Sequence, residues 1–100
     1  MTIAQVLSLE NNSFALKGAV TFYTAPALCA ELQQLLPKTE SVTVELNQIT
    51  QCDSASIVVL LQILRQATHN EQKIQFLNIP PKMQVLIELY DLTTVFNNKQ

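Results

Sequence analysis

Hydrophobic and polar positions alternate with a period near two in the first twenty residues of the chain. Residues Ile3–Leu9 alternate weakly, and Phe14–Val20 carries apolar side chains at a similar spacing. Asn11-Asn12 separates the two segments, and asparagine tolerates the backbone conformations that tight turns require. The pattern therefore predicts a β-hairpin at the start of the chain.

A helical pattern follows the hairpin. We expect Thr24 to cap this helix and Pro26 to lie in its first turn, where a missing amide proton costs nothing. Pro37 ends the pattern because proline cannot continue a helix. The predicted buried stripe is Leu28, Leu32, Leu35 and Leu36, and the predicted solvent-facing side chains are Glu31, Gln33 and Gln34.

Alternation returns in Val42–Leu46 and predicts a strand, which a second helical segment follows. The β-branched run Ile57-Val58-Val59 also suits a strand, but the longer window favours a helix for which Asp53 or Ser54 is the natural N-cap. The predicted polar face of this helix is Gln62, Arg65, Gln66 and His69. Its predicted buried face is Ile57, Leu60, Leu61, Leu64 and Thr68. We expect Ala55 and Val58 to point outward, on the same side as Gln62 and Arg65.

The last third of the chain repeats the same succession. Lys73–Ile79 alternates as a strand, Pro80-Pro81 opens a third helix, and Val95-Phe96 is expected to add a short closing element. The predicted inward side chains of the third helix are Val85, Leu86, Leu89 and Tyr90.

The predicted element order is β-β-α-β-α-β-α. Each β-α-β crossover implies neighbouring parallel strands with the connecting helix packed on the sheet. We therefore expect one α/β domain over residues 1–100, with a mixed sheet of four to five strands flanked by three or more helices.

Composition and charge narrow the function classes. Hydrophobic residues make up 48% of the chain and charged residues only 14%, so part of the apolar surface is expected to face a protein partner. A net charge of −2 offers no electrostatic footprint for nucleic acid. The longest apolar run, Ile57–Leu61, is far shorter than the roughly 20 residues that cross a membrane. With no export signal at the N-terminus, we expect a cytoplasmic protein without direct membrane insertion.

Candidate catalytic chemistry is sparse. Gly18 is the only glycine, which excludes the glycine-rich loops that hold nucleotide phosphates. Cys29 and Cys52 lack metal or redox spacing and are expected to be free thiols. His69, the only histidine, is expected to complement the dipole of a helix end. We find no acid–base pair and no nucleophile with a placed base, and we expect no enzyme activity, cofactor or metal.

The segment Cys52–Ser56 combines small side chains, a carboxylate and two hydroxyls directly before a very apolar helix. One interpretation is a plain N-cap followed by small residues that let the helix pack closely on the sheet. The other is a docking surface on which Ser54 is exposed and able to accept a phosphate, with apolar area from Val58 beside it. The candidate partner-binding residues are Asp53, Ser54, Ala55, Val58 and Gln62.

Three segments resemble successive blocks of a STAS domain, the fold of the anti-sigma factor antagonists. They are Gly18–Leu28, Val42–Ala55 and Ile79–Leu92. In kinase-regulated antagonists the corresponding turn usually reads Asp-Ser-Ser/Thr-Gly-Leu, and the first hydroxyl after the aspartate is phosphorylated. The resemblance places that position at Ser54, whereas an alanine and a serine here replace the second hydroxyl and the glycine.

A second branch of this family is similar to the chain in its divergent turn, its leucine-rich second helix and its ending, Leu86–Leu92. This branch is the small cytosolic STAS subunit of Mla-type ABC transporters, which move phospholipid in Gram-negative envelopes. The resemblance implies that Ser54 and the helix it opens bind the transporter's ATPase, which would hold the chain at the inner membrane. The alternatives are an anti-sigma factor antagonist with a serine kinase as partner, and an orphan STAS domain in another scaffold.

Overall fold

The strands form one mixed sheet in the order β1-β2-β3-β4. Our computed structural model describes residues 4–10, 12–35 and 38–96. Strand β1 pairs antiparallel with β2, whereas β2 with β3 and β3 with β4 pair in parallel. The strands are β1 (Ala4–Ser8), β2 (Ser13–Val20), β3 (Ser41–Cys52) and β4 (Lys73–Leu77).

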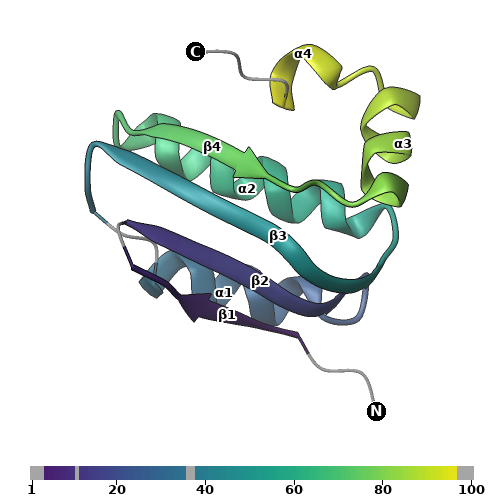
Figure 1. Cartoon of the computed structure of the whole chain (residues 1–100), viewed down its shortest axis with the longest axis horizontal. Helices are drawn as coiled ribbons and strands as arrows, with labels where there is room; N and C mark the ends of the chain where they lie inside the picture. Colours follow the sequence, from purple (N-terminus) through teal and green to yellow (C-terminus); the bar gives the residue numbers. More distant parts are fainter. Residues whose placement is uncertain (1–3, 11, 36–37, 97–100) are drawn as a thin grey trace.

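Helices alternate with the parallel strands, as the sequence pattern predicts. Figure 1 shows α1 and α2 behind the sheet, on one face, with α3 and α4 beyond the end and edge of β4. The predicted α/β class, mixed sheet and element order are therefore confirmed, with a fourth short helix at the end. The helices are α1 (Ala25–Leu35), α2 (Ala55–His69), α3 (Pro81–Leu89) and α4 (Thr93–Phe96).

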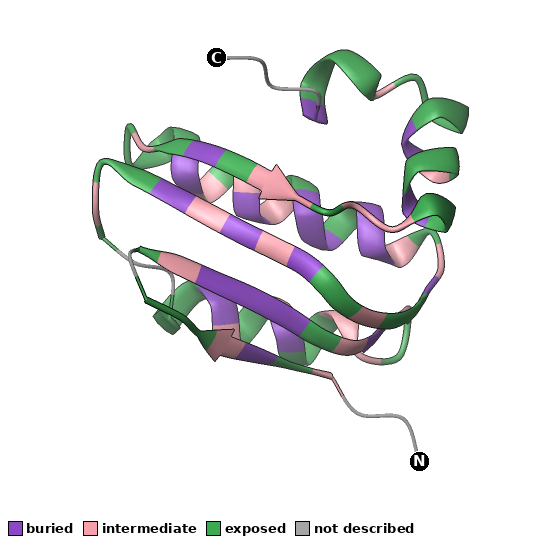
Figure 2. Ribbon diagram, in the orientation of Figure 1, coloured by how far each residue is buried: buried purple, intermediate pink, exposed green. Residues whose placement is uncertain are grey.

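The core lies between the sheet and the two helices behind it. Along β3, Val42, Val44 and Leu46 are buried, whereas the intervening Thr43 and Glu45 are only half-buried on the opposite face. This alternation is visible as purple and pink bands in Figure 2. The largest fully buried side chains come from strands and helices alike: Phe14, Leu16, Leu28, Leu32, Leu46, Leu60, Ile63 and Met83.

The expected hairpin is present, and its turn contains Asn12 in a left-handed conformation with φ of 63°. The expectation that α1 buries Leu28 and Leu32 is also confirmed. The prediction for Leu35 is wrong, because this residue at the end of α1 is exposed. Residues Leu36 and Pro37 lie outside the described residues.

Helix α2 is rotated relative to the predicted buried face. Leu61 and Thr68 were expected inside but are exposed, and Leu64 is half-buried. Arg65 and His69 are exposed as expected. An apolar helix offers more than one hydrophobic stripe, and periodicity alone does not determine which stripe meets the sheet. The buried set is Ser56, Ile57, Val59, Leu60, Ile63 and Ala67.

The inward face of α3 also differs from the prediction. Met83 and Ile87, one turn apart, are the buried residues of this helix, and Leu86 is half-buried. Val85, Leu89 and Tyr90 were predicted inside but are exposed, with 71% of Leu89 accessible. The reason is that α3 lies beyond the end of β4 and packs mainly against α2 and α4, so only a narrow side of the helix is covered (Figure 1).

Candidate partner-binding site

The turn between β3 and α2 is organised by the carboxylate of Asp53. Its Oδ1 accepts a hydrogen bond from the Ala55 amide at 2.9 Å, which satisfies one of the unpaired N–H groups at the start of α2. Its Oδ2 accepts a second hydrogen bond from the Phe22 amide at 3.1 Å. Of the two N-cap candidates in the sequence, Asp53 thus provides the capping side chain, whereas Ser54 makes no side-chain cap hydrogen bond.

The two serines of this turn have opposite environments. Ser54 is exposed. Ser56 is fully buried, and its hydroxyl donates a hydrogen bond to the Asp53 carbonyl at 2.7 Å. Only the Ser54 hydroxyl is therefore accessible to another protein or to a modifying enzyme.

The first two turns of α2 bring the sequence-predicted site residues together. Val58 is 59% exposed, as expected, and lies one helical turn after Ser54 on the same side of the helix. Ala55 and Gln62 are half-buried and form the border of this face. Leu61, which the sequence pattern placed inside, continues the exposed apolar surface along the helix.

Sequence reasoning missed two aromatic residues in the loop between β2 and α1. Phe22 and Tyr23 are 73% and 89% exposed, and their rings pack edge to face with centroids 5.9 Å apart. The Phe22 amide is hydrogen-bonded to Asp53, so this loop lies against the turn that carries Ser54. A detectable signal was two adjacent aromatics within Gly18–Ala30, a run without any charged residue.

Hydrogen bonds within the aromatic loop fix its backbone. Thr24, the expected cap, directly precedes α1, and its carbonyl accepts a hydrogen bond from the Leu28 amide at 3.0 Å. Its hydroxyl accepts a hydrogen bond from the Thr21 amide at 2.9 Å. The same hydroxyl donates to the carbonyl of Ala19 at 2.7 Å, and the Tyr23 amide donates to the Thr21 hydroxyl at 3.3 Å. We call the exposed residues of this loop and of the neighbouring start of α2 the docking surface: Phe22, Tyr23, Ser54, Val58 and Leu61.

The docking surface lies at the edge of the sheet where the three parallel strands end. The loops that follow β2, β3 and β4 meet there, as Figure 1 shows.

Burial raises the pKa of the Cys52 thiol, and this effect is stronger than that of the Lys82 ammonium near the start of α3, which lowers the same pKa. Burial also raises the pKa of Cys29. Both thiols are therefore held in the protonated, weakly nucleophilic form.

Other polar residues have structural surroundings. Glu45 accepts hydrogen bonds from the Asn78 side chain at 2.7 Å and from the Asn47 amide at 3.2 Å, so it links β3 to the loop before α3. His69 is exposed in the last turn of α2.

Residues 4–10, 12–35 and 38–96 contain no group of three or more His, Cys, Asp or Glu side chains placed to hold a metal ion. Within this same part of the chain, no helix has the length and apolar character of a membrane span.

Comparisons with solved structures show the fold. The chain is similar to the anti-sigma factor antagonist SpoIIAA in its unphosphorylated form, with a TM-score of 0.68 and 12% identity over 98% of this chain and 89% of that one. It is also similar to part of the structure of Mglu, with a TM-score of 0.58 and 16% identity over 79% of this chain and 20% of that one. A search of curated proteins found no match.

A comparison with family models identifies the family. The model described as "Mlab, STAS domain" matches residues 3–97, which is nearly the whole chain. The α/β architecture agrees with this match, since it is also the fold of SpoIIAA. The chain belongs to the STAS domain family.

Proposed function

We propose that this chain is the non-catalytic STAS subunit that binds and supports the cytoplasmic ATPase of an Mla-type ABC transporter. The transporter would move phospholipids and maintain the lipid asymmetry of the outer membrane. In this role the chain resides in the cytoplasm and is held at the inner membrane through the complex. The name of the matching family model supports this choice within the STAS family.

The observation that carries the proposal is the docking surface itself. It combines two exposed aromatic side chains with Val58 and Leu61 around the exposed Ser54 hydroxyl. Aromatic residues in a preformed loop are typical of the residues that dominate protein–protein binding energy. The carboxylate of Asp53, which adjoins this surface, has both of its oxygens hydrogen-bonded to backbone amides. An uncharged, apolar partner surface is therefore the best match, with Ser54 as a neutral contact.

A second candidate function is that of an anti-sigma factor antagonist. The exposed hydroxyl of Ser54 at the start of a helix favours it, because a helix N-terminus stabilises a phosphate group. In that function an anti-sigma factor with serine kinase activity would be the partner. Phosphorylation would add about 1.5 to 2 negative charges inside an apolar contact and release the partner.

Affinity purification from the source cells separates the two functions. Tagged wild-type chain and the Ser54→Glu variant would be purified in parallel, with Leu9→Ala as a control at an exposed apolar position outside the docking surface. The proposal expects the transporter ATPase to copurify with the wild type and the control but not with Ser54→Glu. Copurification of an anti-sigma factor kinase in place of the ATPase would overturn it in favour of the second function.

A further inference from the structure

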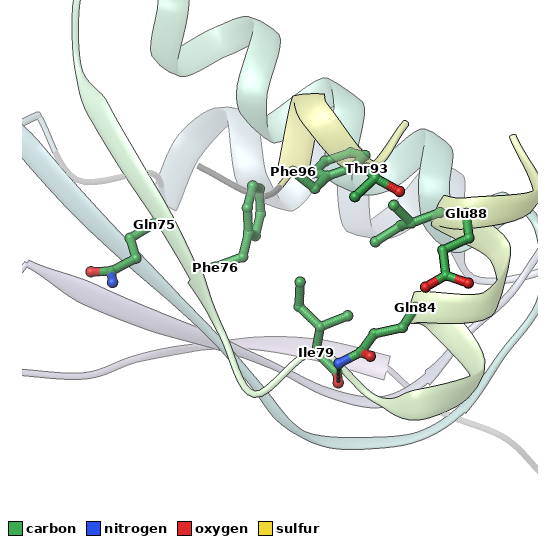
Figure 3. Close-up of a pocket in the computed structure, with 8 residues that line it drawn as sticks. Gln75, Phe76, Ile79, Gln84, Glu88, Thr93 and Phe96 are labelled. Carbon is green, nitrogen blue, oxygen red and sulfur yellow. Dashed lines mark hydrogen bonds between the residues drawn. The ribbon is translucent and has the colours of Figure 1, made fainter. Parts of the chain in front are cut away.

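A pocket of about 430 Å³ lies between β4, α3 and α4, apart from the docking surface. Figure 3 shows the side chains that line it. Its volume is within the range of small-molecule sites, which is about 300–1,000 Å³. Binding of a ligand in this pocket would therefore be independent of the proposed binding of the ATPase at the docking surface.

One wall of the pocket is aromatic and aliphatic. Phe76 of β4 and Phe96 of α4 pack edge to face, with ring centroids 5.5 Å apart and an interplanar angle of 74°. Ile79 continues this wall below Phe76, as Figure 3 shows, and the buried Ile87 closes it on the side of α3. An apolar ligand body would be covered by carbon on this side.

The opposite wall is rich in hydrogen-bond acceptors. Gln84 and Glu88 are one turn apart on α3 and line the pocket, with the Gln84 amide next to Ile79 in Figure 3. The Gln84 Nε2 donates a hydrogen bond to the Ile79 carbonyl at 3.1 Å, which leaves its Oε1 as an acceptor. Among the described residues that line the pocket, Glu88 carries the one ionisable side chain.

We propose that this pocket binds a small organic ammonium ion with an aromatic or branched apolar body. The ammonium group donates hydrogen bonds to the Glu88 carboxylate and to the Gln84 Oε1, and the body packs against Phe76 and Phe96. Anionic ligands such as phosphates and carboxylates are disfavoured by the Glu88 carboxylate.

The test is an NMR titration of the purified chain of residues 1–100 with two probes of nearly equal shape. The probes are 2-phenylethylammonium and the neutral 2-phenylethanol. We expect saturable shifts of the Gln84, Glu88 and Thr93 amides with the ammonium probe, and binding of the alcohol that is about fivefold weaker. The Glu88→Gln variant should bind both probes with the affinity that the wild type has for the alcohol.

The matched control is Glu71→Gln at an exposed glutamate beyond the far end of α2, which should leave both affinities unchanged. Three outcomes would overturn the proposal. They are equal wild-type affinities for the two probes, a preference for the cation that survives Glu88→Gln, and the lack of saturable shifts at the pocket residues. None of these outcomes bears on binding of the ATPase, so this proposal and the proposed function can fail separately.

Discussion

The Oδ2 atom of Asp53 accepts a hydrogen bond from the backbone amide of Phe22 at 3.1 Å, although the two residues are 31 positions apart in the sequence. Because the other carboxylate oxygen caps α2 through Ala55, one side chain both begins this helix and fixes the aromatic loop beside it. The loop is therefore ordered before a partner arrives. Ordering in advance lowers the entropic cost of binding.

Replacing Asp53 by alanine should lower the free energy of unfolding by about 1–2 kcal/mol, since both amide partners lose their acceptor. Asp53→Asn should have a smaller effect, because the carboxamide keeps one acceptor oxygen. Urea denaturation measures the stability, and hydrogen exchange of the Phe22 amide reports the release of the loop. Asp91→Asn is the control, because asparagine tolerates the left-handed conformation at this exposed position. Wild-type stability and exchange in Asp53→Ala would contradict this role of the carboxylate.

The two serines of the turn should respond in opposite ways to a glutamate. Ser54→Glu should leave the fold and the thermal stability unchanged, because the side chain is exposed and an acidic group near a helix N-terminus is favourable. Ser56→Glu should destabilise the fold by several kcal/mol, since it forces a charge into a fully buried site. Thermal unfolding followed by circular dichroism compares the two variants. An unfolded Ser54→Glu protein would mean that Ser54 belongs to the core.

Adjacent valines of α2 provide a second matched pair. Val58→Arg should abolish partner binding without lowering the melting temperature, because Val58 is 59% exposed. Val59→Arg should prevent stable folding, because Val59 is fully buried and its replacement would bury an unpaired charge. Thermal unfolding and a binding assay on the same preparations separate the two effects. A large stability loss in Val58→Arg would show that this residue packs against the sheet.

The aromatic pair should contribute strongly to binding and little to stability. Phe22→Ala and Tyr23→Ala should each weaken binding of the ATPase by about 2 kcal/mol or more, as buried aromatic residues at interfaces commonly do. Leu9→Ala should leave binding unchanged, since Leu9 is exposed outside the docking surface. Isothermal titration calorimetry with each variant measures the loss. Wild-type affinity in both aromatic variants would remove Phe22 and Tyr23 from the interface.

The two thiols should react slowly with iodoacetamide in the folded protein. Burial raises the pKa of Cys29 and of Cys52, and the thiolate is the reactive form. The pKa of each thiol is higher in the folded protein than in the unfolded chain. The contribution of each thiol to the free energy of unfolding is therefore fully present below its pKa in the unfolded chain, and it is lost as the pH rises through its pKa in the folded protein. Alkylation rates in native buffer and in urea between pH 7 and about 9 test this. Equal rates in the two solvents would contradict it.

The sequence pattern predicted the element order and the mixed sheet because periodicity changes clearly between strands and helices. It predicted the facing of the helices less well. In α3 the inward residues are Met83 and Ile87, whereas the apolar Val85 and Leu89 point outward. A helix with apolar residues on two sides is ambiguous in sequence. The side that is buried follows from how α3 packs against α2 and α4, which is a tertiary property.

The candidate site was predicted in part. Asp53, Ser54 and Val58 were identified because a capping residue, a hydroxyl and an apolar side chain occur together before a helix. Phe22 and Tyr23 were missed because their place beside Ser54 depends on parallel pairing of β2 with β3, which brings the two following loops to one edge. Sequence spacing does not reveal such a contact. The Asp53 hydrogen bond to Phe22 establishes it in the structure.

The docking surface around Ser54 is proposed to bind the ATPase of an Mla-type transporter. The most direct test is isothermal titration calorimetry of the purified ATPase with the wild-type chain, Ser54→Glu, Val58→Arg and the Leu9→Ala control. We expect saturable binding for the wild type and the control, and none for the two variants although both remain folded. Absence of binding by the wild-type chain, or unchanged binding by folded Ser54→Glu and Val58→Arg, would contradict it.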